Sequence, residues 1–340
     1  MHVTRRTLLS RASVAAASTL AAPMILRWPA NAAEFAYKYG SALPDGHPMV
    51  IRSREAAEKI KQESNGRFEI TIYPSSVLGQ DTAMMSQALA GALEMYNLSL
   101  DILAQKSPSA AIFGVGFAFP DYPTAWKAMD GDLGNYCRGL SEKVGLYCLD
   151  KAFDHGFREI TMKGKPINAP EDLKGVKIRL PVAPLFISLF RALGASPTPI
   201  NLGEVYSALQ TGLVDGQENP LILIDTNKFY EVQKYCSVTN HIWVGLHVSF
   251  NNDAWKRLPP DLQEMAHKHF SAAALAERDD WQVMNKTEIE TLTKGGLSFN
   301  TPDTEPFQDM LRKAGFYPDC KKQMGDEAWN LLEKYTGPLA

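Results

Sequence analysis

The chain has 340 residues, of which 45% are hydrophobic and 21% are charged, and its formal net charge is −3. This composition is typical of a soluble globular protein, and the length suffices for two domains of ordinary size. Lys and Arg are scattered along the chain, which excludes a basic nucleic-acid-binding face and a polybasic membrane tail.

The first 32 residues have the pattern of an export signal. A twin-arginine motif, TRRTLL, occupies residues 4–9, a weakly apolar and alanine-rich stretch covers residues 12–26, and small residues at 30–32 offer a cleavage site. A transmembrane anchor is the alternative, but the apolar stretch is too short and too weakly apolar to cross a bilayer. We therefore expect residues 1–32 to direct export by the twin-arginine route, which leaves the mature protein in the periplasm.

Strands and helices then alternate along the chain. Apolar Phe68, Ile70 and Ile72 alternate with polar neighbours, which indicates a half-buried strand. By the same criteria we expect strands at residues 35–39, 67–73 and 95–98, and helices at 49–65 and 82–90. This alternation predicts an α/β fold with a largely parallel sheet.

A second set of α/β elements follows a mainly helical region at residues 120–145. We expect strands at 146–153, 157–162, 176–180, 196–199 and 216–218, and helices at 184–193 and 201–212. The strand at 216–218 must be short, because Pro220 cannot donate a hydrogen bond to a sheet. A further strand at residues 243–251 opens a third block.

Residues 261–294 contain neither Gly nor Pro, and their apolar side chains recur at helical spacing. One continuous helix over this stretch would be about 50 Å long and could brace two domains. Two shorter helices with a bend are the alternative. A strand at 297–300 and two short helices complete the chain.

The chain contains no recognisable catalytic or metal-binding motif. It lacks GxSxG, HExxH and P-loop sequences, and the pair Gly114 and Gly116 has no third glycine of a dinucleotide loop. His267 and His269 would point to different faces of a helix. We therefore expect neither catalytic residues nor a metal or cofactor, with an enzyme of unfamiliar site as the alternative.

The four cysteines, Cys137, Cys148, Cys236 and Cys320, show no CxxC or zinc-site spacing. We expect buried free thiols, because a chain of this length does not need disulfides. The oxidising periplasm leaves a Cys137–Cys148 disulfide as the alternative.

Several segments together resemble one protein family. They are IYPSSVLG at 72–79, PEDLKGVKIRLP at 170–181, LGASPTP at 193–199, EVYSALQ at 204–210, VDGQENP at 214–220, KFYEVQKY at 228–235 and TNH at 239–241. In this order and spacing they resemble the DctP-type substrate-binding subunits of tripartite ATP-independent periplasmic (TRAP) transporters. The resemblance covers residues 35–335.

The resemblance implies an α/β, two-domain periplasmic solute-binding protein with a central cleft, hinge segments and a long bracing helix. Domain I would comprise residues 33–155 and about 245–284, and domain II residues 156–244 and about 285–340. The expected partners are a small organic-acid ligand and the small and large membrane subunits of the transporter. The protein itself is expected to be a monomer that binds no nucleic acid.

The resemblance also places the binding residues. Arg179 matches an arginine that pairs with the ligand carboxylate, a contact that a guanidinium makes through two parallel hydrogen bonds. Asn219 matches an amide that contacts the same carboxylate, although a turn residue before Pro220 is the structural alternative. Arg158 matches a second cleft arginine, with a structural ion pair as its alternative.

The remaining predicted ligand-binding residues are wall positions. Sialic-acid binders of the family carry polar groups where this chain has Ala42, Ser99, Val182 and Leu202, so a sialic acid is not expected. His47, Trp243 and His247 are further candidates for the wall, with core packing as the alternative. We expect Ser99, Leu202, His47 and Trp243 to contact ligand.

A mainly apolar wall with one arginine anchor suits a compact monocarboxylate: an aromatic, keto, hydroxy or sugar acid. A C4-type dicarboxylate is the alternative, with Arg158 or a protonated His47 as the second cation. Two alternatives belong to other classes of function. The chain would be an enzyme on a similar two-domain scaffold, or a ligand-sensing subunit.

Overall fold

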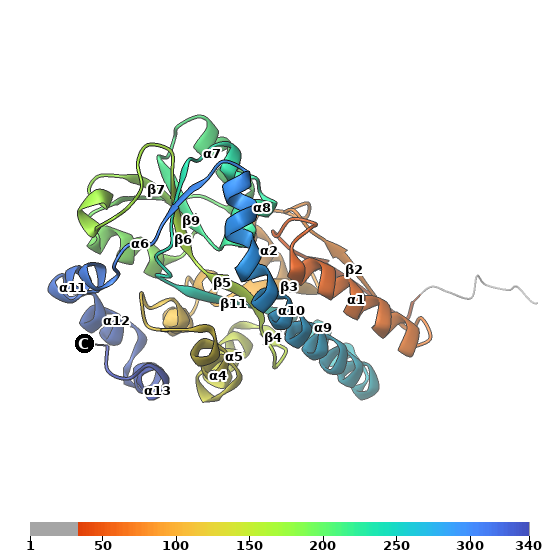
Figure 1. Ribbon diagram of the computed structural model, residues 1–340. Coiled ribbons are helices and arrows are strands. Elements are labelled where there is room, and N and C mark those ends of the chain that lie inside the picture. The colour runs from red at the N-terminus through yellow and green to blue at the C-terminus, as the bar shows by residue number, and fades with distance from the viewer. Residues whose placement is uncertain (1–32, 340) are drawn as a thin grey trace, which may run out of the picture. The chain divides into compact units, whose positions relative to one another are not determined.

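The computed structural model describes residues 33–339, so the predicted export signal lies outside the described residues. Its strands form two six-stranded sheets (Figure 1). The first has the order β2-β1-β3-β11-β4, with β5 also paired to β11. It contains β1 (Phe35–Gly40), β2 (Phe68–Tyr73), β3 (Met95–Ser99), β4 (Leu146–Cys148), β5 (Phe153–Phe157) and β11 (Trp243–Asn251).

The second sheet has the order β12-β10-β6-β9-β7-β8. It contains β6 (Glu159–Met162), β7 (Lys177–Leu180), β8 (Ser196–Pro199), β9 (Gly216–Asn219), β10 (Tyr235–Ser237) and β12 (Ser298–Asn300). Both sheets are mixed, which corrects the prediction of a largely parallel sheet. Strand β11 runs antiparallel to β3, β4 and β5, and β6 runs antiparallel to both β9 and β10.

Helices cover both sheets. Those before β4 are α1 (Pro48–Glu63), α2 (Asp81–Leu89), α3 (Leu100–Leu103), α4 (Tyr122–Asp130) and α5 (Asp132–Val144), with the 3₁₀ helix η1 (Pro108–Gly114). Those beside the second sheet are α6 (Pro184–Ala192), α7 (Val205–Gln210) and α8 (Leu221–Thr226), with η2 (Pro170–Leu173), η3 (Leu202–Glu204) and η4 (Phe229–Glu231). The last are α9 (Asn252–Arg257), α10 (Pro260–Lys294), α11 (Glu305–Lys313), α12 (Phe316–Met324) and α13 (Asp326–Thr336).

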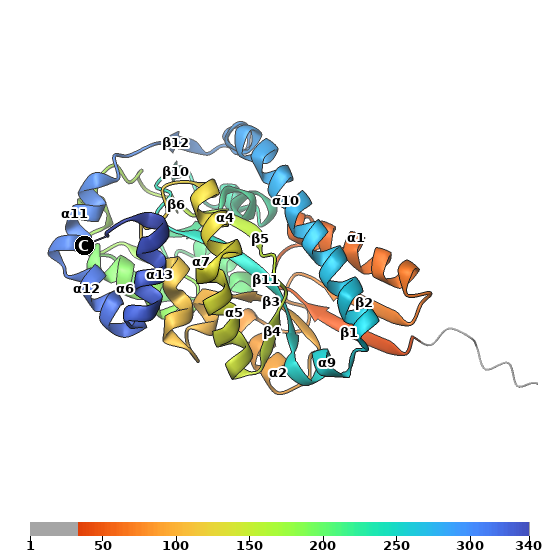
Figure 2. The same cartoon turned by 90° about the horizontal axis from the view of Figure 1, so that it is seen from below.

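Helix α10 is one continuous helix of 35 residues, as the sequence predicts. It packs against α1 and β5 of the first sheet's side and then against α8 and β12 of the second (Figure 2). Through these contacts α10 braces elements of the two sheets.

The chain passes directly from one sheet to the other at two places. Strand β5 belongs to the first sheet and β6 to the second, and only Arg158 lies between them. Residues 238–242 make the return crossing from β10 to β11. The backbone N–H of Arg158 donates to the Ile242 carbonyl at 2.9 Å, so the two crossings are hydrogen-bonded to each other.

Two local predictions are wrong. The strand expected at 146–153 stops at Cys148, and the next strand begins at Phe153. The C-terminus has three short helices rather than two, because Gly325, at φ +86°, separates α12 from α13. Helix α13 packs against α4 and α5, which precede β4 in the chain.

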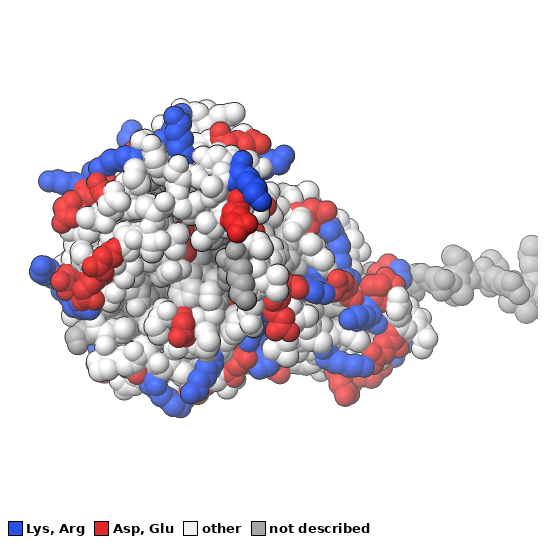
Figure 3. Space-filling model, viewed as in Figure 1, with Lys and Arg blue, Asp and Glu red and all other residues white. Residues whose placement is uncertain are grey.

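The surface of the described residues carries both signs of charge. Figure 3 shows Lys and Arg side chains interspersed with Asp and Glu on the face in view. Within residues 33–339, no helix is both long and apolar enough to cross a membrane. The four cysteines are buried free thiols.

Candidate functional site

A cavity of about 60 Å³ lies between the two sheets. Ligand pockets are typically about 300–1,000 Å³, so this one suits a compact solute. Its lining comprises Ala42, Leu43, Asp81, Asn97, Ser99, Asp101, Ile102, His155, Arg158, Arg179, Pro181, Phe186, Leu202, Asn219, Leu223, Val244 and Leu246. These residues come from both sheets, and Arg158 belongs to a crossing between them.

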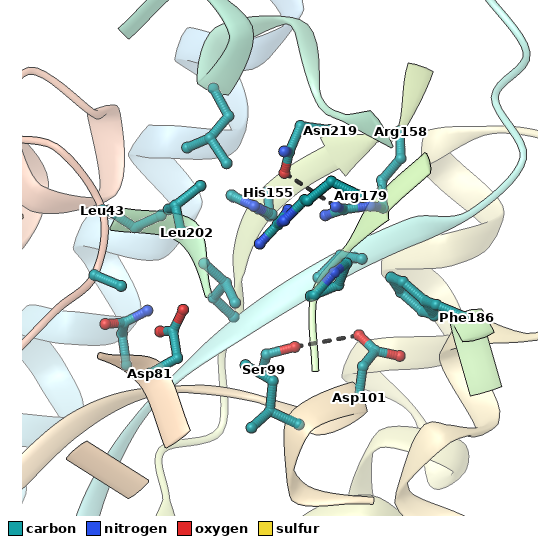
Figure 4. A pocket seen from close by; sticks show the side chains of 17 residues that line it. Leu43, Asp81, Ser99, Asp101, His155, Arg158, Arg179, Phe186, Leu202 and Asn219 are labelled. Carbon is teal, nitrogen blue, oxygen red and sulfur yellow. Dashed lines mark hydrogen bonds between the residues drawn. The ribbon is translucent and has the colours of Figure 1, made fainter. Parts of the chain in front are cut away.

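Arg179 projects from β7 and is only 2% exposed. Its Nε donates to the Ile200 carbonyl at 2.9 Å, which fixes the plane of the guanidinium. Among the described residues, its two terminal nitrogens have no hydrogen-bond partner and no carboxylate forms an ion pair with it. Burial lowers the pKa of Arg179 to about 9, so the group is still charged at neutral pH. Figure 4 shows this guanidinium directed into the cavity.

Arg158 is engaged in a buried ion pair. Its Nε pairs with one Glu218 carboxylate oxygen, and its Nη2 donates to the other at 2.8 Å. The same Nη2 donates to the Asn219 side-chain oxygen at 3.0 Å. Burial pushes the pKa of Glu218 upward, but the charge and hydrogen bonds of Arg158 outweigh it and leave that pKa lowered. The structural ion pair considered from the sequence is thus present, and Arg158 also lines the cavity.

Asn219 ends β9 beside this ion pair and is 2% exposed. Its side-chain nitrogen donates to the side-chain oxygen of Gln217. The side-chain nitrogen of Gln217 in turn donates to the Thr161 hydroxyl at 2.8 Å. The amide is therefore held from both of its ends before any ligand binds. This chain of buried hydrogen bonds orients Asn219 toward the cavity that it shares with Arg179.

Acidic side chains lie across the cavity from the arginines (Figure 4). Asp81 begins α2 and accepts a hydrogen bond from the Tyr96 hydroxyl at 3.4 Å. Asp101 lies in α3 and accepts one from the Ser99 hydroxyl at 3.2 Å. Burial raises the pKa of Asp81 to about 6 and that of Asp101 to about 7.

Three wall candidates, His47, Trp243 and His247, do not belong to the cavity lining. His47 caps α1, where its Nδ1 accepts the Met49 N–H at 3.2 Å, and its ring lies 5.5 Å from that of His155. His155, which the sequence reasoning missed, lines the cavity. Burial lowers the pKa of His47 to about 3.

Trp243 is 1% exposed, and its indole N–H donates to Asp154 at 3.0 Å. Its neighbours in the chain, Val244 and the nearby Leu246, line the cavity from β11. Ligand contact by His47 and Trp243 stays a prediction. It also stays a prediction for the five predicted residues that do line the cavity, which are Ser99, Arg158, Arg179, Leu202 and Asn219.

The sequence reasoning also missed Asp81, Asp101 and Phe186. Asp101 gave a usable signal, since it is the one charged residue in the apolar run 95–104. A buried charge in such a run indicates a function or a partner. Within residues 33–339, no group of three or more His, Cys, Asp or Glu side chains is arranged to hold a metal ion.

Comparison with known proteins identifies the family. Residues 39–315 match the DctP profile, described as "Bacterial extracellular solute-binding protein, family 7". The sialic acid-binding periplasmic protein SiaP of Vibrio cholerae is 31% identical over 307 residues, which cover 90% of each chain. The 2,3-diketo-L-gulonate-binding periplasmic protein YiaO of Escherichia coli is 30% identical and covers 81% of this chain and 84% of its own. The chain spans about half the length of a further relative, the uncharacterized protein y4mM of Sinorhizobium fredii, at 35% identity.

Solved structures agree with this assignment. A TRAP periplasmic solute-binding protein from Pseudomonas putida F1 with bound D-glucuronate is 30% identical, with a TM-score of 0.82 and coverage of 90% and 98%. One from Sulfurospirillum deleyianum with bound succinate is 28% identical, with a TM-score of 0.83 and coverage of 90% and 99%. The two-domain α/β fold predicted from the sequence is thereby confirmed. The chain belongs to the DctP family of TRAP solute-binding proteins, which bind organic acids and are not enzymes.

Proposed function

We propose that this protein captures a compact organic acid with a single carboxylate and delivers it to the small and large membrane subunits of a TRAP transporter. The observation that carries the proposal is Arg179, a buried guanidinium that faces the cavity with two unpartnered nitrogens and no ion pair among the described residues. A buried charge is costly unless it is paired. A ligand carboxylate would supply the pair through two parallel hydrogen bonds, with the oriented Asn219 amide as a third contact.

One carboxylate is favoured over two because the candidates for a second cation are not free. Arg158 already pairs with Glu218 through two of its nitrogens. His47 has a pKa lowered to about 3 by burial, so it is neutral at physiological pH. A dicarboxylate would therefore meet one unpaired cation, Arg179. The succinate-bound relative keeps a C4-type dicarboxylate as the alternative.

Two positions in the wall argue against a sialic acid, although a relative is named for binding one. Ala42 and Leu202 line the cavity and offer no polar side-chain atoms to a polyhydroxylated ligand of that size. The cavity of about 60 Å³ favours a smaller acid.

The location of the protein is part of the proposal. The twin-arginine pattern around Arg5 and Arg6 supports export to the periplasm. Replacing both with Lys should leave precursor in the cytoplasm. Normal periplasmic yield from that double variant would rule out the twin-arginine route.

A thermal-shift screen that pairs each carboxylic acid with its primary amide tests the function. A bound ligand raises the unfolding temperature by mass action. An acid that fits should raise it, whereas its neutral amide should not, because the amide cannot neutralise Arg179. Equal shifts by an acid and its amide would contradict carboxylate recognition. Recovery of every bound acid unchanged separates a receptor from an enzyme.

A further inference from the structure

Asp101 is a buried carboxylate that no described residue neutralises. It is 5% exposed, and its Oδ2 accepts one hydrogen bond, from the Ser99 hydroxyl. Its Oδ1 has no hydrogen-bond partner among the described residues. A buried polar atom without a partner is rare in folded proteins, because it forfeits its hydration without compensation. Asp101 also lines the cavity, and its Oδ2, which accepts only the Ser99 hydroxyl, can accept a second hydrogen bond from a donor on a bound solute.

Other hydrogen-bond acceptors line the cavity together with Asp101. Asp81 and Asn97 also line the cavity, and the side-chain oxygen of Asn97 is likewise buried without a partner among the described residues. Burial raises the pKa of Asp101 and the positive charge of Arg158 acts to lower it, but Arg158 makes its ion pair with Glu218 instead. Figure 4 shows Asp81 and Asp101 on the side of the cavity opposite Arg158, Arg179 and Asn219.

The backbone is shaped to accommodate this carboxylate. A side chain at Gly114 in η1 would overlap Asp101 Oδ1, and its Cβ would lie 2.8 Å from the Phe186 ring. Gly114 therefore lets η1 close over a charged group where a larger residue could not fit. An aspartate kept in a closely packed site, with no structural ion pair, points to a role in binding.

We propose that Asp101 selects organic acids that carry a hydrogen-bond donor, a hydroxyl or an ammonium group, at the end remote from the carboxylate, and rejects those that carry a second carboxylate there. The inference rests on the proposed function, since it takes the ligand carboxylate to lie at Arg179. A donor would satisfy an acceptor through a charge-assisted hydrogen bond. A second carboxylate would face like charge and lose its own hydration.

Four acids of equal chain length test this selection: butanoate, 4-hydroxybutanoate, 4-aminobutanoate and succinate. They differ only at the fourth carbon, which is a methyl group, carries a hydroxyl, carries an ammonium or is a second carboxylate. Calorimetry at pH 8, above the pKa of about 7 to which burial raises Asp101, would compare their affinities, together with those of their five- and six-carbon homologues. A hydrogen bond to a charged group contributes about 1.5–3 kcal/mol, which is about 10- to 150-fold in affinity.

Within a series of equal chain length, we expect the acid that ends in a hydroxyl or the acid that ends in an ammonium to bind at least about tenfold tighter than the acid that ends in a methyl group. The diacid should bind most weakly. The better of the two donors identifies the terminal group. Asp101→Asn keeps an oxygen that can accept the hydrogen bond from Ser99 but removes the negative charge. In this variant the affinity for the diacid should rise at least about tenfold relative to the affinity for the methyl-ended acid. The matched control is Asp225→Asn, which makes the same change in a carboxyl outside the cavity lining and should leave every ratio unchanged.

Three results would overturn the proposal: a diacid that binds as tightly as the donor acids, ratios unchanged in Asp101→Asn, or no binding by any member of the series. If Asp101→Asn fails to fold, Asp101→Ser supplies the second variant. Failure of the underlying function is distinguishable, because it would appear as Arg179→Ala binding these acids as wild type does. Loss of binding in Arg179→Ala with unchanged ratios in Asp101→Asn would reject the selection alone.

Discussion

The buried ion pair beside the cavity makes a quantitative prediction about stability. The side chains of Arg158 and Glu218 are 5% and 0% exposed, and Glu218 Oε2 also lies 3.2 Å from His241 Nε2. Glu218→Gln keeps one oxygen acceptor but leaves the Arg158 charge buried and uncompensated. Removing one partner of a buried pair typically costs about 3–5 kcal/mol. The remaining acceptor places the expected cost near the lower limit.

The expected change in melting temperature follows from the size of the protein. Unfolding entropy is about 2.1 cal/mol/K per residue, or about 0.6 kcal/mol/K for a fold of about 300 residues. A loss of about 3 kcal/mol should therefore lower the Tm by about 5 °C at pH 7 in scanning calorimetry. Glu204→Gln, the same change at an exposed carboxylate, is the control and should shift the Tm by under about 1 °C.

The pH dependence has a definite sign. The folded state lowers the pKa of Glu218, so its stabilisation is fully present above the unfolded pKa, about 4.3, and is lost as the pH falls through the folded value. The Tm difference between wild type and Glu218→Gln should therefore shrink below about pH 4. A Tm change under about 1 °C at pH 7 would refute the reasoning that this pair is a closed, desolvated unit.

Three further predictions concern other parts of the molecule. His247 is fully buried, its ring nitrogens have no hydrogen-bond partner among the described residues, and burial lowers its pKa to about 3. The unfolded chain takes up a proton on this ring below about pH 6.5, whereas the folded protein does not. Between pH 7.5 and 4.5 the free energy of unfolding of wild type, measured in urea, should therefore fall by about 2–3 kcal/mol more than that of His247→Phe. Equal losses in the two proteins would contradict a neutral, buried His247. Gly114→Ala should destabilise by about 1–3 kcal/mol and weaken acid binding through overlap with Asp101. Gly139→Ala, whose Cβ would meet nothing within 4 Å, should not be destabilised, and similar behaviour of both variants would be inconsistent with the packing described. The two crossings between the sheets should act as hinges that let the protein close on its ligand. Small-angle scattering should therefore show a smaller radius of gyration at saturating acid than without acid. An unchanged radius would count against hinge closure.

Local patterns predicted most individual elements. The absence of Gly and Pro from residues 261–294 predicted α10 as one helix, and the alternation in residues 67–73 predicted β2. The direction of strand pairing was not predictable in this way. Strand β11 enters the first sheet about 90 residues after β5 and pairs antiparallel to three strands. Such long-range pairing depends on the topology of the whole chain rather than on the period of any one segment.

The candidate site was predictable to the extent that its residues lie in recognisable motifs. Arg179 and Asn219 lie in segments that resemble the family, and both line the cavity. His47 and Trp243 were chosen by residue type alone, which does not indicate the direction of a side chain. His47 caps helix α1, and Trp243 donates a hydrogen bond to Asp154. The cavity is lined instead by His155, whose ring lies near that of His47, and by Val244, which follows Trp243 in the chain.

The account depends most directly on Arg179 as the anchor for a carboxylate. Calorimetry should compare wild type, Arg179→Lys and Arg179→Ala with an acid found in the thermal-shift screen. Breaking a desolvated charge pair costs about 2–5 kcal/mol, so Arg179→Ala should bind roughly 30-fold to several-thousand-fold more weakly. Arg179→Lys should recover only part of this loss, because an ammonium keeps the charge but not the planar pair of donors. Binding by Arg179→Ala within about threefold of wild type would contradict the central claim.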